Sequence, residues 1–566
     1  MSVIQAVSCD FAKSELPCQD PGASREPMLD TRDPFLHEPS HHPSVNGSDE
    51  ESSPEDSPLT TRRKRMSEPS EEDNNICEGI KVPPREENPN QTLELAVEAT
   101  KENMNAAATL ASQEAIPSPG SPDSPNSNSV EKTLVTKQLS AGLEELELNP
   151  DEEMFSPEWL ANDRHVFVLS EAGKPIYTRH GVEDRLVTLF GVMQALVSVV
   201  QDADDSLLSI QSGDTHFAFL VKGPLILVAV SKIHDSVSQL RLLLTYVFNQ
   251  IVSVLTATQL YRIFEQRHNY DLRRLLAGSE RLMDSLIDQF DQDPALVLGA
   301  VHCLPMGTSD RDAITQTIVK YCSKIKNLVF GVVIGQDRLI ALVRMKKFAL
   351  HPADVHLITN LVRSTEAFKS AEGWTPICLP KFDSSGFLHA HVSYLADDCP
   401  ACFLLLSTDR DDFFPLSEAK QKIVERLRRH GLLDSINTSL RCPEYSVERL
   451  GLPELRHFLY KCKSSAQCTW PRLSPPYTAT PEAYEALLGL YRWAHHRIHY
   501  SARPLRLLYK ATPTEILLGW ATAGFELFAV FEPFCSKLNL MNAANLLLKW
   551  IKKEEDWIFI LNPATL

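Results

Sequence analysis

The chain of 566 residues lacks a phosphate-binding loop. Such a loop needs Gly-x-x-x-x-Gly-Lys-Ser/Thr at the start of a helix, whose free backbone amides hold the phosphates. The nearest match is HVFVLSEAGKPIYTRHG (165–181), where only Gly173 and Lys174 fit and Pro175 replaces the hydroxyl residue. The apolar runs 165–169 and 175–178 instead predict a β-hairpin. We therefore do not expect the chain itself to hydrolyse nucleoside triphosphates.

A disulfide framework and a secretory signal are also missing. The 12 cysteines are scattered without regular spacing, and the N-terminus MSVIQAVSCDFAKSE has no long apolar region. We expect a reducing, cytosolic location. Residues 242–261 carry no charge, but their apolar residues recur at helical spacing with polar residues on another face. A buried amphipathic helix is therefore the preferred interpretation, and a membrane span the alternative.

Acidic residues are concentrated at the beginning of the chain. Residues 1–150 hold 28 Asp/Glu against 12 Lys/Arg and 17 of the 37 prolines, while the whole chain has a net charge of -18. Such a composition buries too little apolar surface to offset the entropy of ordering. Residues 1–158 are predicted to be a disordered acidic regulatory tail, which we hypothesise folds back on a basic surface.

Strand and helix patterns recur three times in the remaining chain. The first unit reads as hairpin, helix 183–201, three strands and two helices; the second begins with a predicted strand at 295–305. The fold class is α+β, with antiparallel five-stranded sheets and helices packed against them. The predicted domains are 159–293, 294–440 and 441–566.

The helix at 183–201 is apolar on more than one side. One stripe suits packing on a sheet, and Gly191, which costs about 1 kcal/mol relative to alanine in a helix, lies in a second row of small residues. The predicted partner-binding face consists of Val187, Thr188, Gly191, Val192, Ala195, Ser198 and Val199. The alternative is that later helices of the same domain cover it.

Metal and redox sites are not expected. Cys399 and Cys402 form a Cys-x-x-Cys, but they precede a strand and not a helix. Four further residues are merely available for zinc: Cys378, His389, His391 and Cys442. The cluster His495, His496 and His499 lies late in a helix, where no carboxylate or cysteine is expected to complete a metal site. We predict no metal, no cofactor and no catalytic residue.

Two basic clusters are candidates for a membrane-facing surface. They are Lys420, Lys422, Arg426, Arg428 and Arg429 on one helix, and Arg456, Lys461 and Lys463 on a strand. Phosphoinositide head groups suit such clusters, and so does plain solvation. Nucleic acid is not an expected partner, because the chain is acidic and has no nucleic-acid-binding motif.

A family resemblance rests on several blocks of sequence. HVFVLSEAGKPIY, NYDLRRLLAGSERLMDSL, WTPICLPKF, FLHAHVSYL, LSTDRDDFF, LRHFLYKCKSS and WIKKEEDWIFIL resemble the Mon/SAND family of vacuolar and endosomal fusion proteins, over about residues 160–566. The resemblance implies three longin domains and an obligate Ccz-type longin partner. It further implies exchange activity toward the late-endosomal Rab GTPase, with recruitment by an early-endosomal Rab and phosphatidylinositol 3-phosphate.

Two functions remain open from the sequence. The first is a guanine nucleotide exchange factor subunit without chemical catalysis, acting in endosome maturation and in lysosome, vacuole and autophagosome fusion. The alternative is a longin-type adaptor or tether that binds a Rab GTPase without exchange. Trp374 is a candidate contact for a recruiting GTPase, or else a core or interdomain tryptophan. We expect a cytoplasmic protein recruited peripherally to these membranes.

Overall fold

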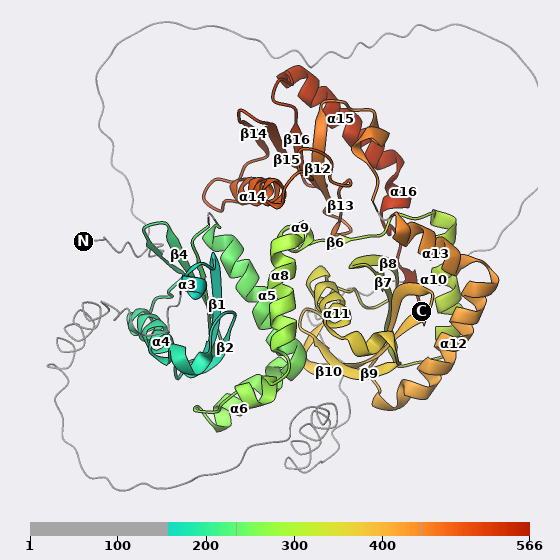
Figure 1. Cartoon of the computed structure of the whole chain (residues 1–566). Helices are drawn as coiled ribbons and strands as arrows, with labels where there is room; N and C mark the ends of the chain where they lie inside the picture. Colours follow the sequence, from blue (N-terminus) through green and yellow to red (C-terminus); the bar gives the residue numbers. More distant parts are fainter. Residues whose placement is uncertain (1–156, 234, 443) are drawn as a thin grey trace, which may run out of the picture. The chain divides into compact units, whose positions relative to one another are not determined.

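The computed structural model describes residues 157–566 apart from 234 and 443, so nearly all of the predicted tail 1–158 lies outside the described residues. Three sheets organise this part of the chain (Figure 1). Each contains five antiparallel strands in the same spatial order, the second along the chain followed by the first, fifth, fourth and third. The repeated α+β domain expected from the sequence is confirmed.

The first domain is a sheet between two helical layers (Figure 1). Its strands are β1 (Arg164–Ser170), β2 (Pro175–Thr178), β3 (Ser209–Ser212), β4 (Thr215–Lys222) and β5 (Leu225–Ser231), in the order β2-β1-β5-β4-β3. Its helices are α3 (Pro157–Leu160), the 3-10 turn η2 (Glu183–Leu186), α4 (Val187–Gln201), α5 (Val237–Leu255), α6 (Ala257–Gln266), α7 (Arg273–Leu276) and α8 (Glu280–Gln292).

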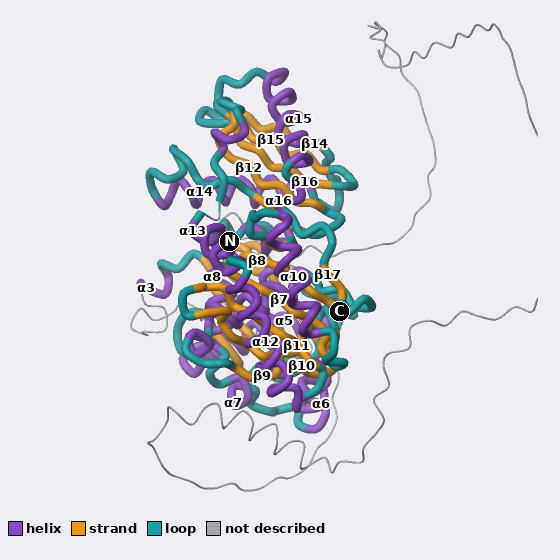
Figure 2. The backbone as a smooth tube through the Cα atoms, turned by 90° about the vertical axis from the view of Figure 1, so that its right-hand side faces the viewer, coloured by secondary structure: helices purple, strands orange, loops and turns teal. Residues whose placement is uncertain are grey.

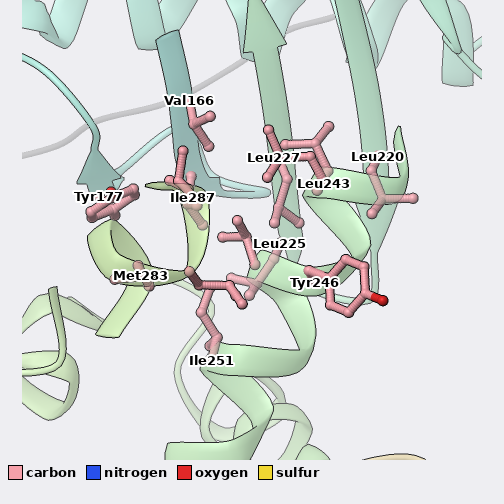
Figure 3. Close-up of a cluster of buried hydrophobic side chains, with 14 of the residues drawn as sticks. Val166, Tyr177, Leu220, Leu225, Leu227, Leu243, Tyr246, Ile251, Met283 and Ile287 are labelled. Carbon is pink, nitrogen blue, oxygen red and sulfur yellow. The ribbon is translucent and has the colours of Figure 1, made fainter. Parts of the chain in front are cut away.

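Strand β1 explains why the sheet has two covered faces. All seven of its residues are buried, and successive side chains of a strand point to opposite faces. Val166 and Val168 enter the core beneath α5 and α8, whereas Phe167 and Leu169 enter the core beneath α4. Figure 3 shows Val166 and Leu227 of the sheet facing Leu243 of α5. A strand covered on both sides reads as a continuous apolar run, and in β1 this run is 166–169.

The predicted hairpin is confirmed by the pairing of β1 with β2, in which Phe167 lies opposite Thr178. Gly173 turns the chain at a φ of 77°, a left-handed conformation that glycine adopts without strain. The Ser170 amide donates to the Lys174 carbonyl at 2.9 Å and closes the turn.

The second domain surrounds a sheet of six strands. Its own strands are β7 (Leu328–Gly335), β8 (Arg338–Arg344), β9 (Gly373–Leu379), β10 (Asp383–Ala396) and β11 (Cys399–Ser407), in the order β8-β7-β11-β10-β9. Its helices are α10 (Thr308–Cys322), α11 (Pro352–Ser364), η3 (Glu366–Lys369), η4 (Arg410–Asp412), α12 (Phe413–Arg429) and α13 (Leu432–Arg441). Helices α10, α12 and α13 share a core on one face, and α11 lies in the core of the other.

The third domain repeats the plan, with strands and α15 forming adjacent layers in Figure 2. Its strands are β12 (Leu455–Cys462), β13 (Gln467–Thr469), β14 (Leu507–Ala511), β15 (Ile516–Ala521) and β16 (Phe525–Phe531), in the order β14-β15-β16-β12-β13. Its helices are η5 (Val447–Leu450), α14 (Pro481–Ile498), α15 (Lys537–Lys553) and α16 (Glu555–Ile558). Helix α14 covers one face, and α15 and α16 cover the other.

Two short strands pair with strands that are far from them in the sequence. Strand β6 (Val301–His302) pairs in parallel with β13, and β17 (Ala564–Thr565) pairs in parallel with β8. The second and third sheets therefore have six strands and not the five predicted. Strand β6 lies in the predicted second domain, 294–440, but pairs in the sheet of the third. Strand β17 lies in the predicted third domain, 441–566, but pairs in the sheet of the second.

The strand predicted at 295–305 is wrong over most of its length. Residues Pro294–Leu298 form helix α9, and only Val301–His302 is strand. The Asp293 carboxylate caps α9 by accepting from the Ala295 amide at 2.8 Å, and Gly299 ends it in a left-handed conformation. The Asp-Pro pair favours the start of a helix and the glycine favours its end, and these signals decide for a helix over the strand that the apolar run predicted.

Candidate functional site

The inner face of α4 is fixed on the first sheet. Leu186, Phe190, Met193 and Val197 are buried, and the Phe190 ring meets Phe167 edge to face with 5.7 Å between centroids. An aromatic side chain buried in this way stabilises the domain by about 3–5 kcal/mol relative to alanine. The helix is therefore held as a rigid element, and its other side is presented in a defined orientation.

The outer face of α4 carries the seven residues of the predicted partner-binding face. Thr188 and Gly191 are exposed, and Val187 and Val199 are 51% and 50% exposed. Val192, Ala195 and Ser198 are half-buried. None of the 15 residues of α4 is charged. A solvent-facing helix normally carries charge on that side, so this face has the composition of a contact surface.

Two observations bear on whether the chain covers this face itself. Helices α5 and α8 pack in the core on the opposite side of the sheet, so they do not supply the cover that was the alternative interpretation. A Cβ atom built on Gly191 would meet no atom within 4 Å. The packing inside this chain therefore does not require glycine at this position, and its role as part of a partner-binding face stays a prediction.

Three basic side chains, Arg456 and Lys461 of β12 and Lys463 just after the strand, are engaged with groups of the same chain. Arg456 donates Nε and an Nη to the Glu532 carboxylate at 2.9 and 2.7 Å. The Lys461 ammonium donates to the Leu298 carbonyl, and Lys463 Nζ lies 3.1 Å from Glu526 Oε1. The structure thus gives these three cations internal partners, which the sequence pattern did not reveal.

The basic residues of α12 are more open. Lys420 is directed inward to Glu372 at 3.1 Å. Lys422 and Arg429 make only exposed pairs one turn along the helix, which are worth about 0.3–0.5 kcal/mol each. Arg428 is exposed and Arg426 half-buried. The end of α12 is therefore the basic surface that an anionic head group could reach.

Trp374 is half-buried on β9, the outermost strand of the second sheet. Its ring stacks on His389 at 5.6 Å and meets Phe413 edge-on at 5.9 Å. The neighbouring Phe414 is 79% exposed and was not singled out from the sequence. A GTPase contact at Trp374 stays a prediction, and these rings form the apolar surface that it would use.

The two thiols of the Cys-x-x-Cys pair cannot bind the same metal ion. Cys399 belongs to the core on one face of the second sheet and Cys402 to the core on the other, because residues three apart on a strand point in opposite directions. Burial raises the pKa of the Cys402 thiol to about 12, so no thiolate forms there at neutral pH.

The expectation that no carboxylate lies near the late histidines is wrong. Glu526 of β16 lies 3.1 Å from His499 Nε2, and His495 belongs to the same group. The sequence did not reveal this because Glu526 meets the histidines only when α14 packs on the sheet that contains β16. A further missed feature is a pair of exposed apolar side chains, Phe534 at 97% and Leu538 at 71%.

Family profiles match each domain in turn. They are described as the first, second and third longin domain of FUZ, MON1 and HPS1, and they match residues 164–286, 326–425 and 454–555. Among curated proteins, "Protein SAND" of Takifugu rubripes is 48% identical over 436 residues, covering 77% of this chain and 83% of that protein.

The chain belongs to the MON1/SAND family. The "Vacuolar fusion protein MON1 homolog A" of Gallus gallus is 47% identical over 73% of this chain and 75% of its own length. The "Vacuolar fusion protein MON1 homolog B" of Mus musculus is 41% identical over 72% and 76%. The three α+β domains are thus the longin domains of this family. An alignment with a solved bacteriophytochrome structure spans 69% of this chain and 95% of that chain, at 9% identity and a TM-score of 0.14.

No single helix in the described part of the chain is long and apolar enough to cross a bilayer. Helices α5 and α6 reach that length and composition only together, as a pair bent by 82°. The apolar side chains of α5, among them Leu243 and Val247, are buried in the core of the first domain, as the sequence predicted.

Proposed function

We propose that this member of the MON1/SAND family is one subunit of a heterodimeric guanine nucleotide exchange factor. It pairs with a Ccz-type longin partner and activates the late-endosomal Rab GTPase. The observation that carries the proposal is the uncharged outer face of α4, which is held rigidly on its sheet and which α5 and α8, packed on the other face of that sheet, do not cover. The names of the relatives, vacuolar fusion proteins, support the setting in membrane fusion.

Exchange of this kind needs no acid, base or nucleophile in the exchange factor. The GTPase supplies the nucleotide pocket, and the factor binds its switch regions more tightly when nucleotide and magnesium are absent. Because coupling between two binding events is reciprocal, such preference necessarily weakens the affinity of the GTPase for nucleotide. Exchange follows from tighter binding to the nucleotide-free GTPase than to the nucleotide-bound GTPase, so the protein acts without a catalytic residue of its own.

Recruitment completes the proposal. An early-endosomal Rab and phosphatidylinositol 3-phosphate bring the cytoplasmic complex to endosomes, lysosomes or vacuoles, and autophagosomes. The exposed basic end of α12 supports the lipid contact, and the ring cluster around Trp374 supports a GTPase contact. Each Lys or Arg near an anionic surface contributes about 1 kcal/mol.

The test measures release of fluorescent GDP from the late-endosomal Rab. The chain is assayed alone, with the Ccz-type partner, and with the partner as Gly191→Arg and Gly489→Arg variants. Gly489 lies exposed in the middle of α14, and a Cβ there also meets nothing within 4 Å, so it is a matched control. Both substitutions replace an exposed helical glycine with the same charged side chain.

We expect fast release only with the partner, retained in Gly489→Arg and lost in Gly191→Arg. An unpaired guanidinium in an apolar contact costs at least about 3 kcal/mol, or more than a hundredfold in affinity. Equal activity of the two variants would remove α4 as the pairing face. Binding of the GTPase with slow release in every case would favour the adaptor or tether.

A further inference from the structure

Three side chains of the third domain converge on one point between α14 and β16. His495 lies in the last turn of α14, and His499, four residues on, caps the C-terminal end of this helix, so the two imidazoles lie side by side with 4.4 Å between ring centroids. Glu526 comes from β16, where it pairs in register with Lys461 of β12. One ligand atom from each of the three side chains lies within 4.8 Å of the other two. In the part of the chain that the structure describes, this is the one such group of histidine, cysteine and acidic residues.

Glu526 is the residue that makes the group unusual. Its side chain is 2% exposed, and a buried carboxylate needs partners for both oxygens. Oε1 has two, His499 Nε2 and Lys463 Nζ, each at 3.1 Å. Oε2 is fully buried and has no hydrogen-bond partner. Such an oxygen, beside two imidazoles, is placed to accept a cation or a further donor.

We propose that His495, His499 and Glu526 form a zinc site, with a water molecule as the fourth ligand. Two imidazole nitrogens and one carboxylate oxygen are a ligand set that Zn²⁺ favours. His499 is 41% exposed, which gives the ion a path from solvent and leaves room for the water. Bound zinc would link the C-terminal end of α14 to strand β16 of the same domain.

Lys463 is the natural competitor of the ion. Zinc–ligand distances of about 2.0–2.2 Å place tetrahedral ligand atoms about 3.4 Å apart, and His499 Nε2 and Glu526 Oε1 already lie 3.1 Å apart. The Lys463 ammonium already occupies Oε1, but its side chain is 31% exposed and can turn outward. Lys461 is directed to the Leu298 carbonyl and does not contact the carboxylate in this way. Zinc and Lys463 therefore compete for one carboxylate, which predicts a site of moderate affinity.

The test is zinc binding by the full chain after treatment with a chelator. Affinity and stoichiometry are measured by competition with a chromophoric zinc indicator, for the natural chain and for His499→Ala, Glu526→Gln, Lys463→Gln and His496→Ala. His496 is the matched control, because it is adjacent to His495 on α14 but its ring meets Tyr500 edge-on outside the group. Other cysteines and histidines contribute the same background to every variant, so only differences are interpreted.

We expect the natural chain and His496→Ala to bind one equivalent more than His499→Ala, or to bind it at least about tenfold more tightly. Lys463→Gln should bind more tightly than the natural chain. With Co²⁺ as a probe, the visible absorption lost in His499→Ala should have no thiolate contribution, because all three ligands are nitrogen or oxygen.

The proposal would be overturned by equal zinc binding in the natural chain and His499→Ala, or by no gain in Lys463→Gln. His499 is partly exposed near the helix end, so its replacement should leave the fold intact even if Glu526→Gln does not.

Discussion

Replacing Gly191 with alanine distinguishes the effect of this residue on the stability of α4 from its effect on partner binding. A Cβ at this position meets no atom within 4 Å, so alanine adds no clash within the chain. Alanine is preferred to glycine inside a helix by about 0.8–1.0 kcal/mol. Local opening of α4 should therefore become about fivefold rarer, since about 1.4 kcal/mol corresponds to a factor of ten. Native-state hydrogen exchange of the α4 amides measures this directly.

The same substitution should weaken binding of the Ccz-type partner. A row of small residues lets another protein approach the helix backbone closely, and an added methyl group in a well-packed contact costs about 1–3 kcal/mol. Affinity should fall roughly 5- to 150-fold while the chain alone becomes more stable. Gly489→Ala on α14 should stabilise its helix in the same way without any loss of binding. Tighter or unchanged partner binding by Gly191→Ala would refute the close approach at this face.

Three further predictions concern charge and pH. Asp235→Ala should destabilise the first domain by about 3–5 kcal/mol, because it leaves the buried Arg164 guanidinium short of a partner; Asp184→Ala, from an exposed pair, should cost less than about 1 kcal/mol in the same denaturant series. Burial lowers the pKa of His457 to about 4, so the folded state binds fewer protons than the unfolded state between pH 6.5 and 4, and stability should fall by about 1.4 kcal/mol per pH unit on acidification there. Thermal scans of His457→Gln should show a shallower acid slope, and an unchanged slope would contradict this assignment. Combined Arg428→Ala and Arg429→Ala should reduce binding to vesicles containing phosphatidylinositol 3-phosphate by about tenfold or more, whereas Arg456→Ala, whose charge is held by Glu532, should change it little in a flotation assay.

Much of the fold was accessible from local pattern. The hairpin around Gly173 is encoded by two apolar runs and a turn, and α5 by apolar residues at helical spacing. The two faces of α4 were accessible for the same reason. One face has the large apolar residues that a sheet requires, and the other has small and β-branched residues without charge.

The rest depends on contacts that no local pattern contains. Strands β6 and β17 have two residues each, too few for any periodicity, and their pairing is decided by where the sheets come together. Glu526 meets His499 only because α14 packs on the face of the sheet to which β16 contributes. The basic residues of β12 looked like a surface cluster because their acceptors, Glu532, Leu298 and Glu526, are remote in sequence.

The parallel strand β17 has a consequence for how the protein is made. The ribosome completes every other strand of the second sheet by residue 407, yet Val343 and Arg344 of β8 acquire their neighbour only when residues 564–565 emerge. Until then this end of β8 exposes unpaired backbone groups, the kind of edge at which chains aggregate. The second sheet is therefore complete only after synthesis of the third domain.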